Sequence, residues 1–265
     1  MFIDSHAHLD DERFDDDRET VIKNLKTDQI DIVINIGADI ASSKSTLNLA
    51  QTYDNIYSVV GVHPHSVSEL VGVGLGVGLD EIEKLARHEK TVAIGEIGLD
   101  YYYENSPKQL QKEYFIEQIR LAKKLDLPIV IHSREAVKDT LDIIKSEKSS
   151  NLRGVMHCFS SSVEIAKEYV KLGFYIAIGG VVTFKNARVT KEVAKYVPLE
   201  SLLIETDCPY LAPEPFRGKR NEPKYIKYTA EEIAKIKEVD LEEIAKITSA
   251  NAKKLFDIKI GDIND

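Results

Sequence analysis

The chain has 265 residues, 43% of them hydrophobic, which is enough to form the core of one large α/β barrel or of two smaller domains. Its formal net charge of -9 argues against a broad electrostatic surface for duplex DNA, although bound divalent cations would invert the local field at a site for a polyanion. The sequence has no apolar run of about 18 residues and no basic segment followed by an apolar one at its start, so we expect a cytoplasmic protein outside the membrane.

Eight short apolar runs alternate with charged segments along the chain. They cover residues 2–6, 31–37, 56–62, 92–97, 128–132, 154–159, 174–179 and 202–207. Between them lie apolar residues at helical spacing, most clearly at 109–125 and 162–172. Runs such as Ile129-Val-Ile131 are continuous, as expected of strands that are buried on both faces. The pattern predicts an α/β fold of the TIM-type (β/α)8 barrel class, with a doubly wound open sheet as the alternative.

The region after the eighth run is predicted to close the fold. A loop rich in proline, arginine and lysine covers 209–223, and helical segments follow at 224–238 and 241–256. We interpret these helices as a C-terminal helical extension of the barrel rather than a second domain. Residues 1–265 are therefore expected to form a single domain.

Alternate glycines occupy the segment 71–78, where the loop after the third predicted strand should lead into a helix at Asp80. Glycine lowers helix propensity. The segment also lacks the spacing and the lysine of a phosphate-binding loop. We expect a mobile surface loop here.

Side chains that bind metals collect at the ends of the predicted strands. Alternate residues of a strand share a face, so His6 and His8 of the first run would point the same way. An isolated His-x-His pair makes ordinary hydrogen bonds more often than it binds a cation. The full set comprises His6, His8, His63, Glu96, His132, His157 and Asp207. Six of the seven histidines lie in or beside this set, and barrel enzymes build their sites at the carboxyl ends of the strands, so a metal site is predicted.

The ligand types indicate two hard or borderline divalent ions. Imidazole with carboxylate suits Mg²⁺, Mn²⁺ or Zn²⁺, whereas thiolates would suggest structural zinc. The predicted ligands are His6, His8 and Asp207 for the first ion, His132 and His157 for the second, and Glu96 as the bridge. Two ions in one site activate a water and stabilise both the attacking and the leaving oxygen, which predicts metal-assisted hydrolysis.

Several further side chains have both a catalytic and an ordinary interpretation. Asp207 is predicted also to accept the proton of the attacking water, although a carboxylate at a strand end can simply cap the next loop. Glu205 is a candidate catalytic acid or half of a buried ion pair. His63 is predicted to contact the leaving oxygen of the substrate, and the alternative is a structural role in the hydrogen-bonded scaffold. Asp4 is expected to orient a ligating histidine, and Arg134 to bind a phosphate or else to pair with an acid.

The only two cysteines are Cys158 and Cys208, which form no disulfide framework and suit a reducing compartment. Each directly follows a predicted metal ligand, and neighbours in a strand point to opposite faces. We therefore expect both to be small buried hydrophobic residues rather than ligands.

The motifs in order resemble the TatD family of metal-dependent hydrolases, within the amidohydrolase superfamily. They are Asp4-Ser-His-Ala-His-Leu9, Gly61-Val-His-Pro-His65, Gly95-Glu-Ile-Gly-Leu-Asp-Tyr101, Ile131-His-Ser-Arg134, His157-Cys-Phe-Ser160, Glu205-Thr-Asp-Cys-Pro-Tyr-Leu211 and Asn251-Ala-Lys-Lys-Leu-Phe256. The resemblance runs nearly from end to end. Several motifs in one order are far more specific than a single His-x-His, which many amidohydrolases share.

The resemblance implies a two-metal site whose ligands match the set above position by position. It also implies deoxyribonuclease activity, commonly the removal of nucleotides from the 3′ end of single strands with Mg²⁺ or Mn²⁺. Glu96 stands where superfamily relatives use a carbamylated lysine, so the bridge needs no modified residue. The segment 71–78 departs from the family's pattern, which affects the local loop and leaves the metal site intact.

Aromatic and basic residues in the loops are candidates for holding a single-stranded nucleic acid end. Aromatic faces stack an unpaired base while a basic group holds its phosphate. The candidate substrate-binding residues are His63, Arg134, Tyr101, Phe159, Tyr210 and Arg217. A small cationic cluster in an acidic chain favours binding of a nucleic acid end in a pocket. We expect the protein to be a monomer. Packing of the loops is the alternative interpretation of the aromatic residues.

Two other functions are compatible with these residues. The same metals could hydrolyse an ester or amide, for example the acyl bond of a mischarged tRNA, since a two-metal centre also stabilises a tetrahedral carbonyl intermediate. A metal-dependent binding module would show affinity without turnover. Open coordination positions and an available base argue against the binding module.

Overall fold

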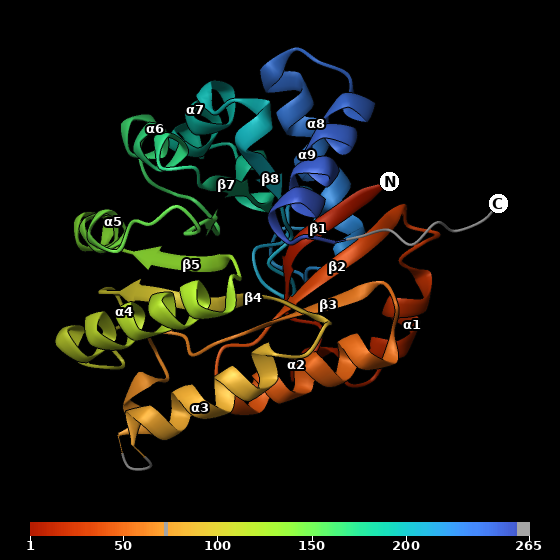
Figure 1. The fold of residues 1–265 in the computed structure, drawn as a ribbon. Coiled ribbons are helices and arrows are strands. Elements are labelled where there is room, and N and C mark those ends of the chain that lie inside the picture. The colour runs from red at the N-terminus through yellow and green to blue at the C-terminus, as the bar shows by residue number, and fades with distance from the viewer. Residues whose placement is uncertain (72–73, 259–265) are drawn as a thin grey trace.

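The computed structural model describes residues 1–71 and 74–258, in which eight parallel strands form a barrel surrounded by helices (Figure 1). The strands are β1 (Phe2–Ala7), β2 (Ile30–Ile36), β3 (Ile56–Val60), β4 (Thr91–Asp100), β5 (Ile129–Arg134), β6 (Gly154–Met156), β7 (Tyr175–Ile178) and β8 (Leu202–Ile204). Each strand pairs in parallel with the next one along the chain, and a parallel bridge between Ala7 and Cys208 joins the first strand to the loop after the last. The predicted TIM-type barrel is confirmed.

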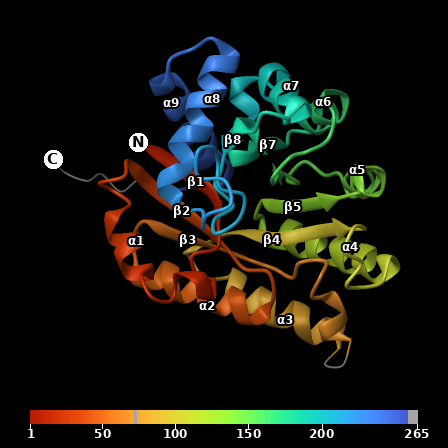
Figure 2. The same cartoon turned by 180° about the vertical axis from the view of Figure 1, so that it is seen from behind.

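Helices follow the strands and cover the outside of the barrel, as the view from behind also shows (Figure 2). They are α1 (Arg18–Asn24), α2 (Ile40–Thr52), α3 (Leu75–Ala86), α4 (Lys108–Leu125), α5 (Val137–Ser146), α6 (Val163–Lys171), α7 (Arg188–Tyr196), α8 (Ile226–Lys237) and α9 (Leu241–Leu255). The last two form the predicted C-terminal extension, and α9 packs against β1 and β8. No helix in the described ranges is long and apolar enough to cross a membrane.

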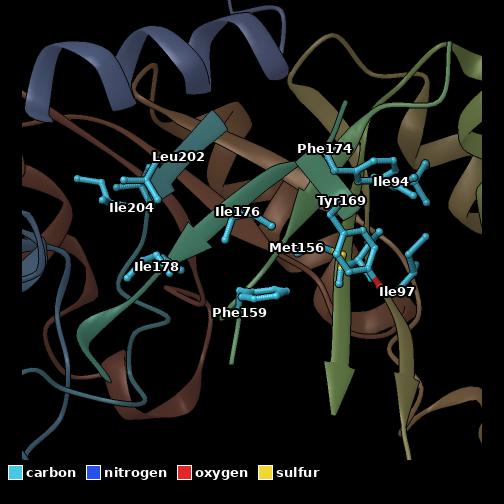
Figure 3. Packing of buried hydrophobic residues seen from close by; sticks show 14 of the residues in the cluster. Ile94, Ile97, Met156, Phe159, Tyr169, Phe174, Ile176, Ile178, Leu202 and Ile204 are labelled. Carbon is cyan, nitrogen blue, oxygen red and sulfur yellow. The ribbon is translucent and has the colours of Figure 1, made fainter. Parts of the chain in front are cut away.

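The strands contribute to two hydrophobic clusters, one on each face of the sheet. In β5, Val130 belongs to an inner cluster with Val155 and Leu203, whereas Ile129 and Ile131 pack in a larger outer cluster with the helices. Alternate residues of a strand point to opposite faces, so a strand that is buried on both faces must be apolar throughout. Figure 3 shows part of the outer cluster, in which Met156, Phe159, Tyr169, Phe174 and Ile176 lie close together.

Two predicted strands end earlier than the sequence pattern suggested. β6 ends at Met156 and β8 at Ile204, so His157 and Asp207 lie in the loops that follow. The backbone of Cys158 (φ 43°) and of Asp207 (φ 58°) adopts the left-handed conformation, which does not occur within a strand. These turns direct the side chains of both loops over the end of the barrel.

The glycine-rich segment contains the start of a helix and not only a loop. α3 begins at Leu75, before the predicted start at Asp80, while Gly72 and Val73 lie outside the described residues. Gly78 is buried, and a Cβ atom there would lie 2.8 Å from the hydroxyl oxygen of Tyr114 in α4 and 2.9 Å from a methyl group of Leu70. Close packing of α3 therefore requires glycine at this position, which outweighs its low helix propensity.

We expect Gly78→Ala to lower the thermal stability of the protein and Gly76→Ala to raise it. Among the described residues, a Cβ at Gly76 meets nothing within 4 Å, so alanine there gains up to about 1 kcal/mol of helix propensity. Alanine at position 78 gains the same helix propensity, but its Cβ must displace the buried Tyr114 ring. Overpacking of this kind costs about 1–3 kcal/mol of stability. Denaturant unfolding of the two variants measures both effects. A stabilised Gly78→Ala variant would contradict the close packing.

Candidate metal centre

The predicted ligands meet at the carboxyl end of the barrel. Five of them line a cavity of about 630 Å³ there, namely His8, Glu96, His132, His157 and Asp207. The sixth, His6, is fully buried beneath it with its Nε2 atom 3.2 Å from Nε2 of His8. Strands β1, β4 and β5 and the loops after β1, β6 and β8 supply these side chains, so residues far apart in sequence converge on one point.

Glu96 occupies the centre of the cluster and turns its two oxygens in different directions. Its Oε1 lies 3.0 Å from Nδ1 of His132 and 3.7 Å from Nε2 of His157. Its Oε2 lies 3.4 Å from Nε2 of His6. The carboxylate therefore turns one oxygen toward His6 and the other toward His132 and His157, as a bridging ligand would, while the His157 ring stacks on that of His6 with 3.5 Å between the ring centres.

The second group is completed by a carboxylate from the loop after β8. Oδ1 of Asp207 lies 3.5 Å from Nε2 of His8 and 3.8 Å from Nε2 of His6. Two imidazole nitrogens and two carboxylates thus face one small volume. This donor set suits a hard or borderline divalent ion, which would replace the proton that Nε2 of His8 carries between His6 at 3.2 Å and Asp207 at 3.5 Å.

Hydrogen bonds to the outer nitrogens turn the ligating nitrogens toward the centre. Nδ1 of His8 lies 3.0 Å from the carbonyl oxygen of Ile36, which can only accept a hydrogen bond. This nitrogen therefore keeps its proton when the ring is neutral, and Nε2 then has the free lone pair. In the same way Nε2 of His132 donates to Asp100 at 3.1 Å, which leaves its Nδ1 free to face Glu96. The residues present fit a metal centre on both sides of Glu96.

Glu205 is placed to hold His157. Its Oε1 lies 3.0 Å from Nδ1 of His157 and accepts a hydrogen bond of 2.7 Å from the backbone amide of Cys158. The residue is only 1% exposed. Both contacts lie on the far side of the His157 ring from Glu96, so the geometry favours a positioning role for Glu205 over direct contact with a substrate.

Asp100 is a residue of the site that the sequence analysis missed. It is fully buried, and one of its oxygens contacts both His132 and His65, while the other accepts from the backbone amides of Tyr102 and Tyr103. Asp100 lies on β4 four residues after Glu96, so the alternation of side chains along a strand could have identified it. Burial raises the pKa of this carboxyl, but the hydrogen bonds from His132, Tyr103 and His65 outweigh it and hold the pKa well below its usual value.

We expect Asp100→Asn to weaken metal binding or activity by about 10- to 100-fold, the usual effect of losing a partner that orients a ligating histidine. The asparagine amide would present a donor to Nε2 of His132 and favour the tautomer with a proton on Nδ1, the nitrogen that faces Glu96. Metal content and turnover measure the effect. Asp139→Asn, which changes a carboxylate bonded to Tyr101, is the control. Unchanged metal affinity in Asp100→Asn would contradict the orienting role.

Two histidines of the cluster hold protons strongly when no metal competes for them. Burial lowers the pKa of His8, but its hydrogen bond to Asp207 and the charges of Asp207 and Glu96 outweigh burial and raise the pKa to about 9. Burial likewise lowers the pKa of His157, while the charges of Glu205, Glu96 and Asp207 raise it to about 10. Metal ligation requires neutral imidazole, so a metal must displace these protons.

Metal binding at pH 7 should therefore release at least two protons per chain, one each from His8 and His157. His132 makes a further contribution, since burial lowers its pKa but its hydrogen bonds to Asp100 and Glu96 outweigh burial and raise it. Because both pKa values lie above 7, the apparent metal affinity should rise with pH by up to about tenfold per unit for each proton displaced. A pH indicator in weakly buffered solution counts the protons, and calorimetry in two buffers checks the count. Metal binding without proton release would contradict the raised pKa values.

The candidate substrate-binding residues divide into two groups. His63, Arg134 and Tyr210 line the same cavity as the ligands, and Phe159 lines a neighbouring one. Tyr101 and Arg217 line neither: Tyr101 donates to Asp139, and the guanidinium carbon of Arg217 lies 4.4 Å from the centre of the Phe184 ring. For Tyr101 the reason is the turn that follows β4, which carries its side chain away from the site.

Arg134 makes no ion pair with a carboxylate in the described part of the chain. Its guanidinium carbon instead lies 4.0 Å from the ring centre of Tyr102 and 4.7 Å from that of Tyr103. The planar group rests on aromatic rings at the edge of the cavity, and the interpretation of Arg134 as a partner of an acid is not supported.

The expected burial is found for Cys208, whereas Cys158 is only partly buried. Cys208 is fully buried. The sulfur of Cys158 lies in one group of potential metal ligands with His157 and Asp207, all within 4.8 Å of one another. The prediction assumed a strand, in which neighbouring side chains point to opposite faces, but the left-handed backbone of Cys158 turns both side chains to the same end of the barrel.

Known metal-dependent hydrolases are similar to this chain over nearly its whole length. The family described as "TatD related DNase" matches residues 3–257. The metal-dependent hydrolase YabD of Bacillus subtilis (strain 168) is 48% identical, over 97% of this chain and 100% of that protein. YcfH of Escherichia coli (strain K12), also named a metal-dependent hydrolase, is 38% identical over 97% of this chain and 96% of its own length.

Solved structures give the same result. The crystal structure of YJJV, a TatD homologue from Escherichia coli K12, has a TM-score of 0.89 and 30% identity, and covers 97% of this chain and 98% of its own. A TatD family hydrolase from Entamoeba histolytica has a TM-score of 0.85 and 26% identity, covering 96% and 97%. The chain belongs to the TatD family of metal-dependent hydrolases.

Proposed function

We propose that this hydrolase is a deoxyribonuclease that removes nucleotides from the 3′ end of single-stranded DNA with two divalent ions, Mg²⁺, Mn²⁺ or Zn²⁺. The observation that carries the proposal is the position of Glu96, whose two oxygens face His6 on one side and His132 with His157 on the other. The ions would lower the pKa of a water and neutralise charge on a phosphate when bound. The family description "TatD related DNase" supports the choice of substrate.

The surrounding residues suit a phosphodiester. Asp207 lies at the floor of the cavity beside His8, where its carboxylate can accept the proton of the water that attacks phosphorus. His63 lies 3.6 Å from Glu96, and burial lowers its pKa well below the usual value, so it is a neutral donor for the leaving 3′ oxygen. Arg134 can bind a phosphate oxygen at the cavity edge.

The dimensions and charge favour a single strand over a duplex. A cavity of about 630 Å³ accepts one or two nucleotides, and its rim carries Tyr103 and Tyr210, whose rings can stack unpaired bases. Two arginines stack on tyrosine rings at this rim. Arg134 lies on Tyr102, and the guanidinium carbon of Arg13 lies 4.2 Å from the centre of the Tyr210 ring. The chain as a whole is acidic, which disfavours tracking along a duplex.

Digestion of an oligonucleotide tests the proposal. Metal-stripped protein receives Mg²⁺ or Mn²⁺ and a 5′-labelled single strand, beside a Glu96→Gln variant purified in the same way. We expect a ladder that shortens from the 3′ end with the wild-type protein and none with the variant. Equal digestion by the two proteins, with metal bound to the wild type, would overturn the nuclease assignment. An RNA end carrying an aminoacyl ester, tested in parallel, detects the acyl hydrolase that uses the same chemistry.

A further inference from the structure

A second cavity lies next to the metal centre, between the ends of β5 and β6 and the helices α5 and α6. Its volume is about 340 Å³. Phe159, Met156 and Ile165 give it apolar walls, and Ser133, Ser160 and Ser161 add polar groups. A pocket with apolar walls and a few polar groups is the usual form of a site for a small planar ligand.

The Tyr169 hydroxyl group is a polar group of this cavity that lacks a partner. Tyr169 lines the cavity from α6 and is only 1% exposed, and its hydroxyl forms no hydrogen bond within the described ranges. Figure 3 shows the Tyr169 ring beside Met156. The Phe159 ring packs edge to face against the Tyr169 ring, with 6.4 Å between the ring centres. The hydroxyl is enclosed by protein atoms, and burying it without a partner is unfavourable, so a ligand edge that displaced the cavity wall to reach it would gain a hydrogen bond.

The two cavities adjoin each other at two shared side chains. Arg134 and His157 line both, so the second cavity lies directly beside the metal centre. Tyr102, which supports Arg134 from below, also lines the second cavity. A group held there would lie directly beside the predicted scissile phosphate.

We propose that this cavity binds the nucleobase of the 3′-terminal nucleotide while its 5′ phosphate lies at the metal centre. The inference rests on the proposed nuclease function and adds the place of the departing base. A nucleobase has apolar faces for Phe159 and Ile165 and a polar edge for the Tyr169 hydroxyl. In the reaction, water adds to phosphorus, the bond to the 3′ oxygen of the preceding nucleotide breaks, and that oxygen takes a proton. The released 5′ mononucleotide leaves from this cavity.

Kinetics with a base-free end test the inference. Two oligonucleotides are compared, one with a normal 3′-terminal nucleotide and one whose terminal residue is an abasic deoxyribose analogue. For the wild-type protein we expect kcat/KM to be about 10- to 100-fold higher for the normal end, the effect of one stacked base. Ile165→Trp should fill the cavity and reduce this ratio to about one. Glu164→Trp, on the exposed side of the same helix, should leave the ratio unchanged.

The ratio separates a binding role from damage to the fold. A general loss of structure lowers kcat/KM for both substrates together. An unchanged ratio in Ile165→Trp therefore overturns the inference even if total activity falls. A wild-type ratio near one overturns it as well. Tyr169→Phe removes only the unpartnered hydroxyl, and it should lower the ratio several-fold without lowering thermal stability.

Binding of a mononucleotide tests the cavity without any cleavage. Thymidine 5′-monophosphate and 2-deoxyribose 5-phosphate are titrated into the metal-loaded wild type and into Ile165→Trp. We expect the wild type to bind the nucleotide at least about tenfold more tightly than the sugar phosphate, and the variant to bind them equally. If no oligonucleotide is cleaved but this difference appears, the nuclease proposal fails and the base site stands. If cleavage occurs without the difference, the base site fails.

Discussion

Glu96→Gln should lower the rate of hydrolysis by about 10³-fold or more and reduce the metal content of the protein. The substitution keeps the shape of the side chain but removes the charge between His6 and His132, and it replaces one oxygen by an amide that cannot ligate. Losing one preorganised charged group from such a site costs about 10²- to 10³-fold in turnover, and losing a metal as well costs more.

Metal analysis of the dialysed protein and single-turnover kinetics measure this effect. Glu104→Gln makes the same chemical change at an exposed residue shortly after β4 and should leave both quantities unchanged. Circular dichroism checks that the Glu96→Gln variant is folded. Wild-type metal content together with wild-type turnover would show that Glu96 is not the bridge.

Asp207→Asn should reduce turnover by about 10²- to 10⁴-fold, the range for removing a general base, while the ligands on the other side of Glu96 stay in place. Asparagine cannot accept the proton of the attacking water. The backbone at Asp207 has a φ of 58°, a conformation that asparagine adopts readily, so the substitution does not strain the loop.

Asp126→Asn is a closely matched control. Asp126 also has a left-handed backbone, with a φ of 54°, but it lies at the exposed end of α4 and pairs with Arg153. The measurement is turnover at saturating metal, so that a lower affinity is separated from a lost proton acceptor. If added metal restores full turnover to Asp207→Asn, the residue is a ligand only and another group accepts the proton.

The order of the strands and the identities of the predicted ligands follow from the sequence alone. Parallel barrel strands are buried on both faces and therefore form continuous apolar runs that can be recognised singly, as at Ile129-Val-Ile131. The first polar residue after such a run lies at the carboxyl end of the barrel, regardless of how distant segments of the chain fold. His6, Glu96 and His132 could be assigned to the site because each is fixed by its own strand.

The exact ends of the elements could not be predicted, because tertiary contacts determine them. β6 stops at Met156 since the next residues turn over the barrel, and this brings Cys158 beside His157. α3 starts early because Gly78 packs closely on Tyr114 of α4. In both cases the local sequence indicated something else, and contacts between segments distant in the chain were stronger than the local propensity.

The chemistry of the site also depends on partners from other strands. Asp4 was expected to orient a ligating ring, but its carboxylate accepts from the backbone amides of His6 and Thr206 and so fixes the loop that carries Asp207. Which nitrogen of His8 carries the proton is set by the carbonyl of Ile36. A sequence determines which side chains can bind a metal, since that is a property of each residue. Only the tertiary structure decides which atom faces the metal and which cavity adjoins it, since these depend on neighbours that the chain brings together by folding.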